Sequence, residues 1–151
     1  MGYTEVKTHI KINSKDDIER VSSYLSGFPF DEKYIEQNGY LTLNTEMVSF
    51  ENFEEIANGI SAELNLNVLI SLVYDSDVAV IQGYVNGEKK YEEVKSFGEN
   101  AEMDRQRFLQ DFFPDCSVSD FNEVLDKDDC TYAEDRLFEL SDIVGIKLLD
   151  E

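Results

Sequence analysis

The most constraining feature of the sequence is a nearly continuous apolar run, Val68 to Tyr74, that is rich in β-branched residues. Runs of this kind are typical of a central strand that is buried on both faces of a sheet. The segment Asp75–Asp77 predicts a turn into a second strand, Val78 to Val85, and Asn86-Gly87 predicts a hairpin turn into a third, Lys89 to Phe97. The middle of the chain is therefore predicted to form three consecutive strands.

The first 64 residues alternate between strand and helix periodicities. Thr4 to Ile12 alternates apolar with polar side chains, as expected of a half-buried strand, and His9 falls on its polar side. Residues 14–27 and 49–64 each begin with a serine suited to a helix N-cap and continue with apolar residues at helical spacing. Between these two helices, an Asn-Gly pair predicts a hairpin over residues 34–43.

The order of these patterns is typical of an α+β fold. It fits an antiparallel sheet with helices on one face, of ferredoxin-like or split βαβ type. Beyond Gly98 the alternation ends and helical spacing replaces it, at 103–114, 121–125 and 133–143. Residues 98–151 are therefore predicted to be an acidic helical appendage on a sheet core formed by residues 1–97. No linker-like tract separates the two parts, so a single domain spanning 1–151 is expected.

The charge balance constrains the partners. The chain has 33 acidic and 13 basic residues, a formal net charge of −20. Such a chain is not expected to bind nucleic acid through phosphates or to bind anionic membrane surfaces, and electrostatic steering favours partners with basic patches. The sequence has no apolar run of membrane-spanning length and no signal peptide at its N-terminus, so a soluble, cytoplasmic protein is expected.

The acid excess is densest between residues 111 and 142, where apolar residues at helical intervals indicate folded helices. Carboxylates on folded helices would be held in fixed positions, and we predict that they form a partner-binding surface. The predicted binding residues are Asp111, Asp115, Asp120, Glu123, Asp126, Asp128, Asp129, Glu134, Asp135 and Glu139. Evenly spread charge would give about one net negative per 400 Å², against about one per 100 Å² on duplex DNA, so mimicry of DNA would require clustering on one face.

Catalytic and metal-binding patterns are absent from the sequence. His9 is the only histidine, and Cys116 and Cys130 lack the spacing of a zinc site and are expected to be free thiols. Their acidic surroundings should raise the pKa of both thiols. Residues 126–137 begin like a calcium loop but lack its glycine and its final glutamate, and no phosphate-binding glycine pattern opens a helix. We therefore expect a protein without cofactor or metal that is not an enzyme.

The compact, acidic profile resembles that of phage or plasmid anti-restriction and anti-CRISPR proteins. The leading hypothesis is an acidic inhibitor that blocks a basic, nucleic-acid-acting protein, with a DNA mimic as its extreme form. One alternative is an immunity protein that neutralises a bacterial toxin. Another is a non-catalytic assembly or regulatory subunit that pairs with itself, as in a homodimer, or with another chain. The aromatic residues that motivate the assembly hypothesis are Phe28, Phe30, Tyr34, Tyr40, Tyr84 and Tyr91.

Overall fold

The computed structural model describes residues 2–29, 31–128 and 132–150, which form a six-stranded antiparallel sheet with the order β2-β3-β1-β4-β5-β6. The strands are β1 (Glu5–Lys11), β2 (Tyr34–Gln37), β3 (Tyr40–Leu43), β4 (Val68–Tyr74), β5 (Val78–Val85) and β6 (Glu88–Lys95). The helices are α1 (Lys15–Tyr24), α2 (Phe53–Leu64), α3 (Arg105–Phe112), α4 (Val118–Leu125) and α5 (Ala133–Val144). Single 3₁₀ turns occur at η1 (Leu25–Gly27) and η2 (Thr45–Met47). The predicted α+β class is confirmed.

Turn chemistry explains the hairpins. Asn38 and Gly39 have φ of 42° and 81°, and Asn86 and Gly87 have φ of 54° and 80°, the left-handed conformations that a type I′ turn requires. Ser49 was predicted to be the N-cap of the second helix, but the N-cap is Asn52, three residues later, and α2 begins at Phe53. Residues 50–52 form a turn before the helix, and the backbone carbonyl of Ser49 accepts hydrogen bonds from the backbone N–H groups of Asn52 and Phe53.

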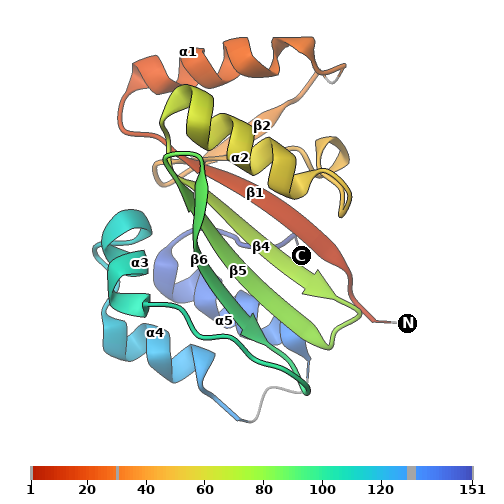
Figure 1. Ribbon diagram of the computed structural model, residues 1–151, viewed down its shortest axis with the longest axis vertical. Coiled ribbons are helices and arrows are strands. Elements are labelled where there is room, and N and C mark those ends of the chain that lie inside the picture. The colour runs from red at the N-terminus through yellow and green to blue at the C-terminus, as the bar shows by residue number, and fades with distance from the viewer. Residues whose placement is uncertain (1, 30, 129–131, 151) are drawn as a thin grey trace.

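Helices cover both faces of the sheet. In Figure 1, α1 and α2 lie above the sheet, and α3, α4 and α5 lie below it. The prediction of helices on one face therefore holds only for the first 95 residues. The C-terminal helices form a second core against the other face, in which Phe108, Phe112, Phe121 and Leu137 are almost fully buried. The described residues between 98 and 150 therefore form part of the core and cover the second face of the sheet.

Along the chain, the first four strands and two helices follow one another in the predicted order. α1 joins β1 to β2 and α2 joins β3 to β4, and these strands lie in the order β2-β3-β1-β4. β5 and β6 extend the sheet beyond β4, and further helices cover its other face. The ferredoxin-like assignment stays a prediction.

The prediction of a half-buried β1 is wrong, since all of residues 6–10 are buried. Its polar side lies beneath residues 145–150, which we call the C-terminal strap. Lys7 Nζ lies 2.7 Å from Asp150 Oδ1, and the backbone N–H of Asp150 donates to Glu5 Oε2 at 2.8 Å. The strap residues Ile146, Leu148 and Leu149 join the second core. Across the described ranges, no helix is long and apolar enough to cross a membrane.

Candidate partner-binding surfaces

Four of the ten predicted binding residues are held in contacts within the fold. Asp126 accepts hydrogen bonds from both Nη atoms of Arg105, each at 2.9 Å, and its Oδ1 lies 3.2 Å from Lys95 Nζ. The hydrogen bonds from Arg105 lower the pKa of Asp126 to about 2. The other three contacts are Asp111 with Tyr91 and Lys90, Glu134 with Ser76, and Glu139 with Lys127. These carboxylates stabilise tertiary structure.

Five others are exposed. They are Asp115, Asp120, Glu123, Asp128 and Asp135. Within the described ranges, the carboxylates of these five residues make no hydrogen bond or ion pair. Asp129, the tenth predicted residue, lies outside the described residues, as does Cys130. The predicted acidic block is therefore divided between structural and free carboxylates.

Four carboxylates line a groove of about 300 Å³ between α4 and α5, which we call the α4–α5 groove. Asp120 and Glu123 come from α4, and Glu139 and Asp142 come from α5. Each pair is three residues apart, so its members share one helix face. The remaining lining residues are Val124, Lys127 and Ile143. The groove combines apolar contact with an excess of negative charge. Asp142 was not among the predicted residues, although its spacing from Glu139 was a usable signal.

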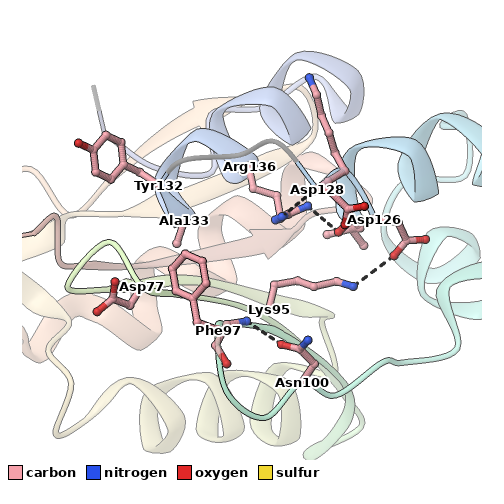
Figure 2. A pocket seen from close by; sticks show the side chains of 12 residues that line it. Asp77, Lys95, Phe97, Asn100, Asp126, Asp128, Tyr132, Ala133 and Arg136 are labelled. Atoms are coloured by element: carbon pink, nitrogen blue, oxygen red, sulfur yellow. Dashed lines mark hydrogen bonds and ion pairs between the residues drawn. The ribbon is translucent and has the colours of Figure 1, made fainter.

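A second cavity, of about 360 Å³, lies between the C-terminal end of β6 and the N-terminal end of α5. We call it the turn-end pocket. Phe97 and Tyr132 line it, and their side chains are 83% and 54% exposed. Figure 2 shows the ring of Phe97 between Asp77 and Lys95 and pointing toward Ala133. Sequence reasoning missed this pocket. The sequence indicated this pocket only through two aromatic residues, Phe97 and Tyr132, that lie in otherwise polar segments.

The cations that line the turn-end pocket are already bonded. Lys95 pairs with Asp126, and Lys127 pairs with Glu139. The guanidinium of Arg136 donates hydrogen bonds to the backbone carbonyls of residues 124, 125 and 127, where it caps the C-terminal end of α4. In the described part of the chain, the carboxylates of Asp77 and Asp128 have no bonded partner. Because Arg136 bonds only neutral carbonyls, the three cations and three carboxylates that line the pocket balance in formal charge; among the described residues, Asp77 and Asp128 are the carboxylates left to bind an incoming cation.

The single histidine is a core residue. His9 is fully buried, with Nδ1 2.8 Å from Thr42 Oγ1 and Nε2 3.3 Å from Ser71 Oγ. Burial lowers its pKa to about 3, so the ring is neutral near pH 7. No group of three or more His, Cys, Asp or Glu side chains suited to a metal ion occurs in the described ranges.

The predicted rise in thiol pKa is confirmed for Cys116. This thiol is half-buried, and burial together with the charge of Asp120 raises its pKa.

The aromatic residues that motivated the assembly hypothesis lie mostly inside the fold. Tyr40, Tyr84 and Tyr91 are each less than 5% exposed. Tyr34 is half-buried and shares a hydrogen bond with Ser22 at 2.9 Å. Phe28 is also half-buried, and Phe30 lies outside the described residues. The five described side chains of this set do not form an exposed pairing surface.

No protein-family model matches the chain, and the comparisons with curated proteins and with solved structures found no match.

Proposed function

We propose that the protein is a non-catalytic inhibitor that binds a basic, nucleic-acid-acting protein through the α4–α5 groove. The observation that carries this proposal is the convergence of four carboxylates from two packed helices on one groove with a single cation, Lys127. That cation is already paired with Glu139 at 2.9 Å. An incoming basic side chain would meet a net negative groove.

The groove has the chemistry to hold a lysine or an arginine. Val124 and Ile143 offer apolar contact for the aliphatic stem of such a side chain, and the carboxylates surround its charged head. The overall charge of −20 would accelerate the encounter with a basic surface, and this steering weakens with salt. The long-range attraction from the net charge and the local contacts with the groove carboxylates would both favour binding of a basic partner.

The distribution of charge favours a local contact over mimicry of a DNA duplex. The accessible surface is 8165 Å², which spreads the net charge at about one per 400 Å². Of the predicted acidic residues, Asp111, Asp126, Glu134 and Glu139 are bonded within the fold. These four carboxylates are engaged by other groups of the fold, which makes them less suited to stand in for phosphates. We therefore propose that the inhibitor covers a basic patch without imitating a helix of DNA.

The test compares two charge-reversal variants on immobilised protein. One carries Asp120→Lys and Glu123→Lys in the groove. The control carries Asp16→Lys and Glu19→Lys, a pair on α1 with the same spacing and the same change in charge. Host lysate is loaded at low salt and eluted with rising ionic strength, and the eluted proteins are identified and competed with duplex DNA.

We expect wild type and control to retain a nucleic-acid-acting protein that duplex DNA displaces, and the groove variant to lose it. If the groove variant and the control variant retain this protein equally well, the proposal is wrong, because the groove would then not be needed for binding. A salt-resistant toxin that duplex DNA does not displace would replace inhibition with the immunity hypothesis.

A further inference from the structure

The exposed aromatic residues of the described chain gather around the turn between β4 and β5. Tyr74 ends β4, and its ring lies 6.0 Å from that of Phe50. Phe97 follows the end of β6. This end lies beside the start of β5, because Lys95 pairs with Ala79. Tyr132 precedes Ala133, whose backbone N–H donates to the carbonyl of Ser76 at 2.9 Å. Exposed aromatic groups concentrated in one place are typical of protein-docking surfaces.

The turn itself is held in place by two other segments, residues 2–4 and the start of α5. Asp75 and Ser76 have φ of 51° and 57°, a left-handed conformation that is costly for residues other than glycine. Ser76 donates its backbone N–H to the carbonyl of Tyr3 at 2.8 Å and its hydroxyl to Glu134 at 2.9 Å. These bonds fix the position of Asp77 beside the turn-end pocket. A partner would therefore meet a surface that is already ordered, which reduces the entropy cost of binding.

We propose that the turn-end pocket is a second contact for the same basic partner and that it receives an arginine side chain between Phe97 and Tyr132. This inference rests on the proposed function. A planar guanidinium stacks on aromatic rings and pairs with carboxylates, and the pocket offers both groups through its two rings and through Asp77 and Asp128, whose carboxylates make no bond to the described residues. Its volume of about 360 Å³ is at the lower end of the range for ligand pockets, which suits a single side chain rather than a larger ligand.

The pocket and the α4–α5 groove are parts of one surface. Lys127 lines both of them. A basic partner that covers the groove would therefore extend over the pocket without a change in the fold. The pocket adds aromatic contacts that the groove lacks, so it would select arginine over lysine, whereas the groove would accept either cation.

The test uses two probes, an octamer of arginine and an octamer of lysine, titrated by calorimetry at low salt. For wild type we expect tighter binding of the arginine peptide. Phe97→Ala removes a side chain that is 83% exposed, so the variant should fold normally. It should weaken arginine-peptide binding by about three- to tenfold and reduce the preference over lysine. Phe50→Ala, an exposed phenylalanine outside the pocket, is the matched control and should keep the preference.

The outcomes separate this inference from the proposed function. If Phe97→Ala and Asp77→Asn leave the arginine preference unchanged while Asp120→Lys with Glu123→Lys abolishes binding, the pocket inference is overturned and the groove proposal stands. If the groove variant binds both peptides like wild type and Phe97→Ala loses the arginine preference, the pocket stands without the groove. If no variant changes binding, both fail.

Discussion

Arg105 donates two hydrogen bonds to the carboxylate of Glu93, from Nε at 3.1 Å and from Nη2 at 2.9 Å, and both side chains are almost fully buried. The same guanidinium bonds Asp126 and the side-chain oxygen of Asn122, at the end of α4. One residue of α3 thus connects the edge strand β6 with α4. The contact positions one wall of the turn-end pocket, because Asp126 lines it.

Replacing Arg105 by alanine should cost about 3–5 kcal/mol in the free energy of unfolding, because it leaves the buried Glu93 carboxylate with only the distant Lys95 Nζ, 3.9 Å away, as a charge partner. Arg107 on the same helix is the matched control. Its side chain is 72% exposed, and its nearest carboxylate, on Asp104, lies 3.7 Å away. Arg107→Ala should change stability by less than about 0.5 kcal/mol. Urea denaturation measures both, and similar losses for the two variants would contradict the buried role of Arg105.

The buried His9 should make stability fall with acid before most carboxylates titrate. Its pKa is about 3 in the fold, against about 6.5 in an unfolded chain. The unfolded state therefore binds the proton first, and the stabilising contribution, complete above pH 6.5, is lost progressively as pH falls toward 3. Between pH 7 and pH 5 the loss should be roughly 2 kcal/mol.

The measurement for His9 compares urea denaturation of wild type and His9→Gln at pH 7 and pH 5. The variant is expected to be less stable at both values but to show a smaller change between them. An unchanged pH dependence would show that His9 is not the group responsible.

Unlike the ring nitrogens of His9, the buried hydroxyl of Thr8 has no hydrogen-bond partner among the described residues. Its side chain is fully buried, and its hydroxyl makes no hydrogen bond within the described chain. Thr8→Val should therefore raise the free energy of unfolding by about 1 kcal/mol. Thr42→Val is the control, because the Thr42 hydroxyl lies 2.8 Å from both His9 Nδ1 and Gln37 Nε2, and it should cost about 1–3 kcal/mol. Destabilisation by Thr8→Val would mean that the hydroxyl has a hydrogen-bond partner after all.

Gly83 lies where β5 passes beneath the second core. A Cβ added there would lie 2.7 Å from Cε2 of Phe112 and 2.9 Å from Cδ2 of Tyr91, and both rings are buried. Gly83→Ala should therefore lower the free energy of unfolding by about 1–3 kcal/mol through overpacking. Gly27 has nothing within 4 Å of the same position, so Gly27→Ala should be neutral or slightly stabilising. Thermal melts of the two variants would check this, and a neutral Gly83→Ala would contradict the close packing of these rings.

Local sequence signals were sufficient for most of the elements. Strands β4 and β5 begin and end at the predicted residues, because continuous β-branched runs and turn residues act over a few positions. The helical spacing of the C-terminal third predicted the bounds of α3, α4 and α5 within about three residues. The candidate surface was predicted less well. Among its carboxylates, Asp126 and Asp128 are two residues apart, yet Asp126 bonds Arg105 and the carboxylate of Asp128 makes no bond to any described residue.

The sequence by itself determined the order of strands and helices, the hairpin turns and the acidic character of the C-terminal third, because these depend on side-chain periodicity, backbone preferences and composition. Tertiary structure decided which face of β1 is covered and which carboxylates remain available. His9 was placed on a polar side because Lys7 and Lys11, two positions away on the same side of the strand, are charged, but the strap that contacts it is more than 130 residues away. Burial and ion pairing depend on contacts between distant segments, and a single sequence carries no local signal for them.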